Sequence, residues 1–271
     1  MGVSISQERA LIGTQGLVLR RREQWGAVRS YTDPRTVVEP VTRLFLHITD
    51  TNRSNFNSND AHARGVEAIG ISRFPNTGIS YNALILPGGL LYEAQPFGRR
   101  GAHTVNEREL SECARPGCPS IGMPLTAPSP DKFNLNFNSR AVSFAGNVGD
   151  TFTDADMRAA ARWGAAYKLA GLVTRDARWH GHRCAKAKAC PGDKAFNRLG
   201  EIVELTEDFV RNGLEDDVTV EELLDFEIST GQGRFKIATL PANAALLPVI
   251  KAKGDALAAQ IAELESRLGP A

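Results

Sequence analysis

The stretch VTRLFLHIT, residues 41–49, is dense in apolar and β-branched side chains and predicts a buried strand. A second apolar stretch, ISYNALILPGGLLYEAQ at 79–95, contains Pro-Gly-Gly at 87–89, which predicts a hairpin turn. The stretch RAVSFAGNV at 140–148 repeats the strand pattern. Between the second and third strands, residues 104–140 are rich in Pro, Ser, Asn and Gly, which is typical of a long ordered loop with functional potential.

Two segments carry helix signals. Thr153, followed three residues later by Asp156, predicts a capped helix over 153–170. The face that this helix would bury holds Met157, Ala160, Ala161 and Gly164. A second helix is expected over about 193–212, where apolar residues recur at helical spacing and Gly213 supplies the stop. Strands mixed with helices predict an α/β domain that ends near residue 213.

The chain therefore divides into a lead-in at 1–20, a main domain at 21–213 and an appendage at 214–271. In the appendage Ile250, Leu257 and Leu264 repeat every seven residues, which predicts a short helix. This helix is short and interrupted at Gly254, so oligomerisation, docking onto the main domain and cell-wall targeting are all open as its role.

Composition limits the classes of partner. The 271 residues include 32 basic and 31 acidic side chains, a net charge of +1, so no overall electrostatic attraction favours nucleic acid or an anionic membrane. No apolar run approaches the roughly 18 residues needed to span a bilayer. The first residues lack the pattern of a secretory signal, so an extracellular substrate would require another route out of the cell.

Four cysteines are too few for a disulfide scaffold in a chain of this length. Cys113 and Cys118 lie five residues apart and form either a small-loop disulfide or two thiols; a reducing cytosol favours the thiols.

The stretch WHGHRCAKAKACPGDKAF, 179–196, crowds histidines and cysteines together. His182 and Cys190 are eight residues apart, a separation that a loop can close around one metal ion, although a polar surface loop with one buried cysteine is the simpler interpretation. His47 is the only polar side chain in the middle of LFLHIT, and a lone histidine in a strand is usually a hydrogen-bonded core residue. Together, two imidazoles and one thiolate leave the fourth position of a zinc ion for water, as in catalytic sites.

Five motifs in order carry a resemblance to a known family. They are RREQWGA (21–27), LFLHIT (44–49), ISYNALI (79–85), GAHTVN (101–106) and GHRCAKAKACPG (181–192). Over about residues 20–205 the chain resembles the type-2 N-acetylmuramoyl-L-alanine amidases, which include phage lysozyme-amidases and the peptidoglycan recognition proteins. The resemblance implies a mixed central β-sheet flanked by helices, with a C-terminal helical appendage beyond it. It also implies Zn²⁺ as the cofactor and bacterial peptidoglycan as the partner.

The resemblance assigns roles to individual residues. It makes His47, His182 and Cys190 the zinc ligands and Tyr81 and Lys188 the catalytic side chains. Lys188 would stabilise charge on the amide oxygen, and Tyr81 would orient the attacking water or help to transfer a proton. Two further residues, His103 and Asn106, would line the substrate cleft, whereas Trp25 is expected in the core.

The chain departs from the family pattern beside these residues. Ile48 replaces a frequent second histidine, Asn82 another histidine, and Cys184 an aspartate. His180 or Cys184 could in principle replace a neighbouring ligand, although only His182 and Cys190 keep the family spacing. Elsewhere, His62 has no motif around it and is expected at the surface. Glu93 is expected either near the cleft or facing solvent.

The predicted function is hydrolysis of the N-acetylmuramoyl-L-alanine bond by a phage endolysin, held in the host cytoplasm until a holin releases it to the cell wall. A bacterial enzyme exported by an unusual route would look the same. Two alternatives are a recognition module that binds peptidoglycan without cutting it and a virion component that carries an amidase domain. Recognition-only relatives typically lack the cysteine ligand, and this chain retains Cys190. The expected partners are peptidoglycan and, through the C-terminal helix, a second copy of the chain, with no nucleic acid and no membrane insertion.

Overall fold

The computed structural model describes residues 4–29, 41–73, 78–96, 98–99, 101–104, 118–119, 135–136, 138–185, 188–214, 227–230 and 233–236. The chain forms two compact units, Met1–Glu215 and Asp216–Ala271. All of the secondary structure described below except one hairpin belongs to the first unit.

The first unit is built on a five-stranded sheet with the strand order β3-β2-β4-β1-β5. Its strands are β1 (Val41–Ile48), β2 (Ala83–Leu86), β3 (Leu90–Glu93), β4 (Ser139–Phe144) and β5 (Val173–Gly181). β1 runs parallel to both β4 and β5, and β2 runs parallel to β4. β2 and β3 form the antiparallel hairpin that Pro-Gly-Gly predicted. The mixed sheet is thus confirmed, and the nearly continuous apolar sequence of β1 reflects its burial on both faces.

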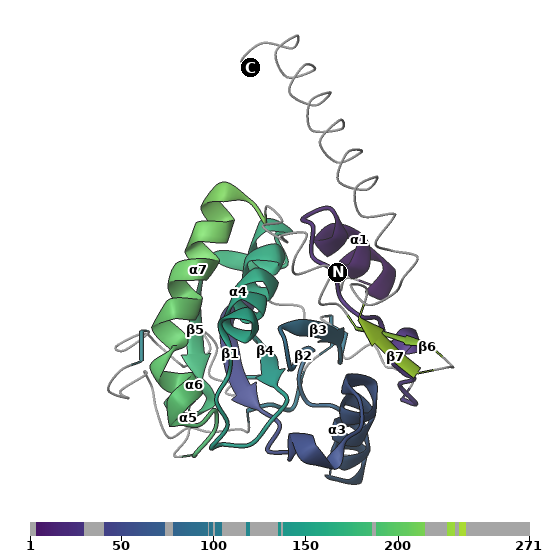
Figure 1. The fold of residues 1–271 in the computed structure, drawn as a ribbon. Coiled ribbons are helices and arrows are strands. Elements are labelled where there is room, and N and C mark those ends of the chain that lie inside the picture. Colours follow the sequence, from purple (N-terminus) through teal and green to yellow (C-terminus); the bar gives the residue numbers. More distant parts are fainter. Residues whose placement is uncertain are drawn as a thin grey trace. The chain divides into compact units, whose positions relative to one another are not determined.

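Two helices cover one face of this sheet, namely α4 (Asp154–Leu169) and α7 (Leu199–Asn212), which lie side by side in Figure 1. α4 approaches closely at Gly164, where an added Cβ would lie 2.6 Å from the Trp179 ring of β5 and 3.2 Å from Leu44 of β1. The Trp179 indole N–H in turn donates to Thr206 of α7 at 3.0 Å. These contacts show that Leu44 and Trp179 point to the face of the sheet that α4 and α7 cover. The side chains that alternate with them along β1 and β5 point to the opposite face.

The remaining helices are α1 (Ile5–Gly13), α2 (Arg22–Trp25), α3 (Asn59–Arg73), α5 (His182–Ala185) and α6 (Asp193–Asn197), with a 3-10 turn η1 at Arg53–Asn55. α1 is tied to the hairpin by Arg9, whose Nε donates to Glu93 at 3.0 Å. Glu93 is buried and also accepts from the backbone N–H of Arg22, so the expectation that this carboxylate faces solvent is wrong. Trp25 is buried, as expected, and its indole donates to the Glu93 carbonyl.

The helix predictions hold with one difference. α4 begins after the Thr153 cap, whose hydroxyl accepts from the Asp156 N–H while the Asp156 side chain accepts from Thr153. The predicted helix over 193–212 is two helices, because Arg198 leaves helical geometry at φ −96° and ψ 4°. Its guanidinium bonds Asp154, Glu201 and the Phe152 carbonyl, which anchors the break against the start of α4.

His62 lies in α3, which the sequence pattern did not reveal, and it is 2% exposed rather than on the surface. Its Nε2 lies 2.6 Å from the Thr51 hydroxyl, and its ring stacks on Phe56 with 4.3 Å between centroids. α3 thus buries, against Thr51 and Phe56, a histidine that no local motif marks.

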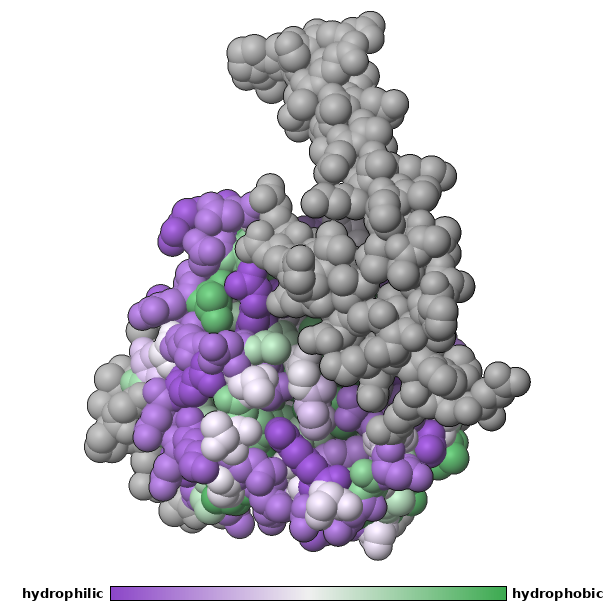
Figure 2. Space-filling view, in the orientation of Figure 1, coloured by the Kyte–Doolittle hydropathy of each residue, from purple (hydrophilic) through white to green (hydrophobic). Residues whose placement is uncertain are grey.

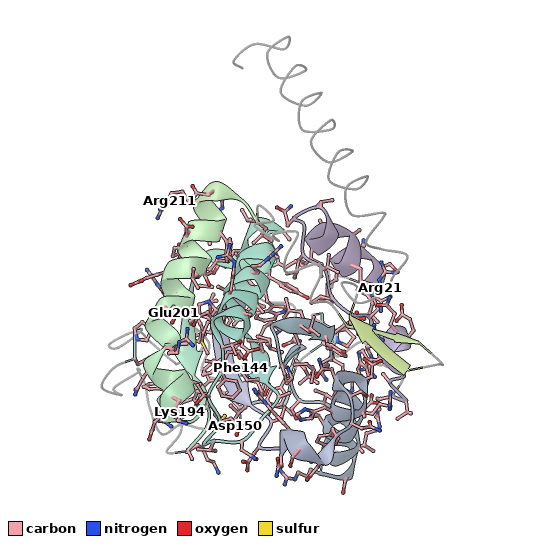
Figure 3. The ribbon with its side chains drawn as sticks, viewed as in Figure 1. Arg21, Phe144, Asp150, Lys194, Glu201 and Arg211 are labelled. Carbon is pink, nitrogen blue, oxygen red and sulfur yellow. The ribbon has the colours of Figure 1, made fainter. Side chains whose placement is uncertain are left out.

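The outer surface of the first unit is mixed in character. Figure 2 shows hydrophilic residues over most of the described surface in that view, with hydrophobic ones scattered among them. Figure 3 shows Glu201 and Arg211 along α7, whereas Phe144 ends β4 in the interior, stacked on Phe152. None of the helices in the described ranges is both long and apolar enough to cross a membrane.

In the second unit, β6 (Glu227–Thr230) and β7 (Gly233–Lys236) form an antiparallel hairpin. The predicted heptad helix at 250–268 lies outside the described residues, so it stays a prediction.

Candidate metal centre

The alternation of β1 places two rings on the face away from α4. Leu44 contacts the helical layer, so Phe45 and His47 point to the other side of the sheet. His47 stands one residue before the end of β1, and His182 directly follows β5. Because β1 and β5 are parallel neighbours, their carboxyl ends meet, and residues 135 positions apart in the chain become neighbours.

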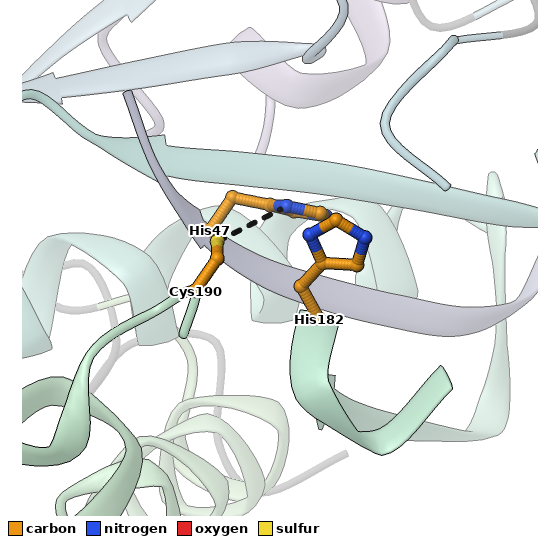
Figure 4. A group of neighbouring side chains, drawn as sticks. All are labelled: His47, His182 and Cys190. Atoms are coloured by element: carbon orange, nitrogen blue, oxygen red, sulfur yellow. Dashed lines mark hydrogen bonds between the residues drawn. The ribbon is translucent and has the colours of Figure 1, made fainter. Parts of the chain in front are cut away.

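His47, His182 and Cys190 form a compact group, drawn in Figure 4, whose ligand atoms lie within 4.8 Å of one another. The Cys190 Sγ lies 3.6 Å from Nδ1 of His47 and accepts the backbone N–H of Ile48 at 3.3 Å. The two imidazole rings are 4.5 Å apart between centroids. Two imidazoles and one thiol at these separations are a suitable donor set for a zinc-class cation.

Burial sets the protonation of this group. Desolvation, followed by the charges of His182 and His103, holds the pKa of His47 well below its usual value, so the imidazole stays neutral and keeps a lone pair. Desolvation raises the pKa of the Cys190 thiol to about 12, and the Ile48 N–H offsets this only in part. A bound cation would favour the thiolate, because metal ions deprotonate coordinating thiols.

The loop that carries Cys190 is held from two sides. The Arg183 guanidinium donates to Asp193 and to the Ala189 carbonyl, each at 2.6 Å, and lies over the Phe196 ring. At Gly181, an added Cβ would lie 2.6 Å from Phe196, so only glycine permits this close turn from β5 into α5. Position 184, an aspartate in the family pattern, is Cys184 here. Arg183 instead holds the loop in place through these contacts.

Tyr81 stands next to the group. Its ring centroid is 5.1 Å from that of His47, and its hydroxyl donates to the Ile48 carbonyl at 3.4 Å. Burial, followed by the charge of Cys190, raises the pKa of Tyr81 above its ordinary value. The phenol is therefore a protonated donor beside the metal ligands.

The other predicted site residues are placed differently. His103 is buried, with its ring edge-on to His47 at 5.2 Å and its Nε2 3.2 Å from the Ser139 hydroxyl. Lys188 is exposed on the loop before Cys190, and within the described residues it has no hydrogen-bond or ion-pair partner. Asn106 lies outside the described residues, so its role stays a prediction.

The two alternative ligands do not join this group. His180 and Cys184 lie instead with Cys118 in a second cluster, again with ligand atoms within 4.8 Å of one another. Cys118 is a thiol rather than half of a disulfide, which agrees with the thiol interpretation, whereas Cys113 lies outside the described residues.

A mixed five-stranded sheet with two imidazoles and a thiol converging at the carboxyl ends of β1 and β5 defines an α/β protein with a candidate metal centre. A family model described as N-acetylmuramoyl-L-alanine amidase, Amidase_2, matches residues 38–193, and the chain belongs to this family. The matched range contains all three residues of the group.

Solved structures with the same fold are peptidoglycan recognition proteins. Apis mellifera PGRP-SA is 19% identical with a TM-score of 0.52, covering 68% of this chain and 94% of its own. Drosophila PGRP-SA is 22% identical with a TM-score of 0.51, covering 68% and 91%. PGRP-LE, solved in complex with tracheal cytotoxin, a monomeric diaminopimelic acid-type peptidoglycan, is 21% identical with a TM-score of 0.51, covering 69% and 92%. No curated protein matched the chain.

Proposed function

We propose that this protein is a zinc-dependent N-acetylmuramoyl-L-alanine amidase that hydrolyses the bond between the lactyl group of N-acetylmuramic acid and L-alanine in peptidoglycan. The observation that carries the proposal is the convergence of His47, His182 and Cys190 beside a protonated phenol. Family membership supplies the substrate class, and the peptidoglycan fragment bound to PGRP-LE supports it.

The three residues of the group would hold Zn²⁺. When bound there, zinc polarises a scissile carbonyl and activates water for attack. The thiol adds negative charge to the site once it is deprotonated, and the neutral His47 is available without losing a proton. The chain therefore contributes a partly buried, preorganised ligand set that needs little rearrangement to accept the ion.

Tyr81 and Lys188 act on the substrate in this proposal. As the amide carbonyl becomes tetrahedral, its oxygen gains negative charge, and a donor aimed at that oxygen lowers the barrier. Lys188 supplies a cation on an exposed loop that leads directly to Cys190. Tyr81 orients the nucleophile or passes a proton, because its hydroxyl is held near the end of β1 by the Ile48 carbonyl. His103 and Asn106 would contact the glycan or the peptide stem.

The biological setting we propose is phage lysis, with the enzyme held in the host cytoplasm until a holin lets it reach the wall. Its support is the lysine two residues before the ligand cysteine, which resembles phage-type members of the family. Expression inside a bacterial host with and without a co-expressed holin tests this setting: lysis that requires the holin is expected, and holin-independent lysis would contradict it.

The hydrolysis itself is tested on purified peptidoglycan. New N-terminal L-alanine should appear with zinc, and it should disappear with chelator and in Cys190→Ala. Arg211→Ala, a change at an exposed residue of α7, is the matched control and should retain full activity. Tight wall binding without any new amine would overturn the hydrolytic proposal and favour a recognition module.

A further inference from the structure

A second cluster of histidine and cysteine side chains lies beside the first. Cys118, His180 and Cys184 place their ligand atoms within 4.8 Å of one another. Their exposed fractions are 3%, 1% and 0%, so the cluster is closed off from solvent. Two thiols and an imidazole that converge in the core are a donor set that zinc prefers.

The two clusters draw on the same turn of chain. His180 and Cys184 belong to the second cluster, whereas His182 and Cys190 belong to the first. Successive residues of the turn from β5 into α5 therefore contribute to different clusters. Phe45 lies between the clusters: its ring stacks on His180 at 5.3 Å and tilts against His47 at 6.2 Å. One buried aromatic ring therefore separates two distinct donor sets on the same face of the sheet.

We infer that Cys118, His180 and Cys184 form a second metal site that holds a zinc-class cation with a structural role. Two thiolates and one imidazole are donors that zinc prefers, and they supply three of its four positions. Their burial, which leaves no access for a substrate, is what argues for a structural role. Binding would release the two thiol protons and pair both sulfurs with the cation. The site is separate from the hydrolytic function proposed above and does not depend on it.

A disulfide between the two cysteines is the competing arrangement. Their sulfur atoms lie 2.9 Å apart, and both residues are thiols. A disulfide requires about 2.05 Å, and two thiolates on one tetrahedral zinc require about 3.8 Å. The separation falls between these values, and the convergence of the His180 imidazole on the same point favours the metal.

The metal would join distant parts of the chain. Cys118 is 66 residues from Cys184, while His180 and Cys184 flank the ligand His182. A cation held by all three would pin the Cys118 backbone to the corner that positions His182. Losing it should loosen that corner and lower thermal stability.

Metal content per chain tests the inference directly. Protein purified with reductant and excess zinc and then dialysed should contain two zinc ions per chain, as measured by elemental mass spectrometry. Cys118→Ser and Cys190→Ser should each hold one, and the double variant should hold none. Cobalt(II) substitution gives a second readout: its thiolate charge-transfer absorption should fall more in Cys118→Ser/Cys184→Ser than in Cys190→Ser, because the second site contributes two thiolates.

One zinc ion in the unmodified protein, unchanged in Cys118→Ser, would overturn the inference. So would a Cys118–Cys184 disulfide found by peptide mapping in protein loaded with metal. If Cys118→Ser fails to fold, His180→Asn, which keeps both thiols, should still lose one zinc ion. The count also separates this site from the proposed function, because an inactive protein with two zinc ions would contradict only the latter.

Discussion

The Sγ atom of Cys190 lies 3.6 Å from Nδ1 of His47, although 143 residues of chain separate the two. His47 stands on β1 and Cys190 on the loop after α5, so the ligand set exists only when β1 and β5 are paired. We expect Cys190→Ser to lower amidase activity by at least about 100-fold, because it removes a ligand outright.

The same variant should also lose the zinc of this site, measured as metal content per chain. His62→Gln is the matched control, since His62 is another buried histidine but stands outside both clusters. It should keep the metal content of the unmodified protein. A Cys190→Ser protein with full activity would contradict the assignment of the ligand.

Tyr81→Phe tests the phenol. Removing the hydroxyl should lower kcat by about 100- to 1000-fold, as for the loss of one transition-state donor. KM and zinc content should stay nearly unchanged, because the ring still packs against His47. Steady-state kinetics on soluble muropeptides provide the measurement. A rise in KM at constant kcat would instead make Tyr81 a substrate-binding residue.

Lys188→Ala should lower kcat by about 10- to 100-fold if its cation faces developing negative charge. Lys188→Arg should recover part of that loss, because it restores the charge with a different shape. Arg211→Ala, which removes an exposed cation from α7, controls for the change in net charge. Equal activity of Lys188→Ala and Arg211→Ala would remove Lys188 from the proposed catalytic machinery.

Thr153→Ala removes the side-chain cap of α4, the helix that packs across the sheet. The free energy of unfolding should fall by about 1 kcal/mol, the usual cost of losing such a cap. Urea denaturation gives the value. Thr153→Ser keeps the hydroxyl and should lose much less, so an equal loss in both variants would refute the capping explanation.

Stability should depend on the protonation of His62. Burial, followed by the charge of Arg53, lowers the pKa of His62 to about 4 in the folded protein. The unfolded chain binds a proton near pH 6.5, so this residue weakens folding as the pH falls from about 6.5 toward 4, and not above that window. From pH 7 to pH 5 its contribution should amount to roughly 1–2 kcal/mol of lost stability.

Urea unfolding of the unmodified protein and His62→Gln at both pH values tests this. His62→Gln cannot titrate, so its stability should fall less over the same interval. Parallel losses in the two proteins would show that other groups account for the pH dependence.

Much of the site was predictable from local sequence. The LFLHIT segment marks His47 because a polar side chain interrupts a buried strand, and the spacing of His182 and Cys190 lies within one short stretch. The Thr153 cap likewise depends on residues three apart. Such features can be predicted because the residues that cause them are close together in the sequence.

Other features could not be predicted from the sequence, because they depend on contacts between elements rather than on local sequence patterns. His62 is buried where α3 packs on Thr51 and Phe56, and Glu93 is bonded by Arg9 of α1, which is 84 residues away. The strand β5 was missed because Thr174, Arg175 and Asp176 make its first half polar, and it is held in the sheet by pairing with β1. The break falls at Arg198, whereas the nearby glycine, Gly200, lies inside α7.

The sequence by itself determined the fold class and the family, because strand patterns, caps and ordered motifs are encoded in neighbouring residues. Only the tertiary structure decided which histidines and cysteines share a site. His180 and Cys184 are interleaved with His182 along the chain, yet they belong to a different cluster, and the ring of Phe45 contacts both His180 and His47. Ligand geometry depends on which surfaces pack together, and that is settled when the sheet forms.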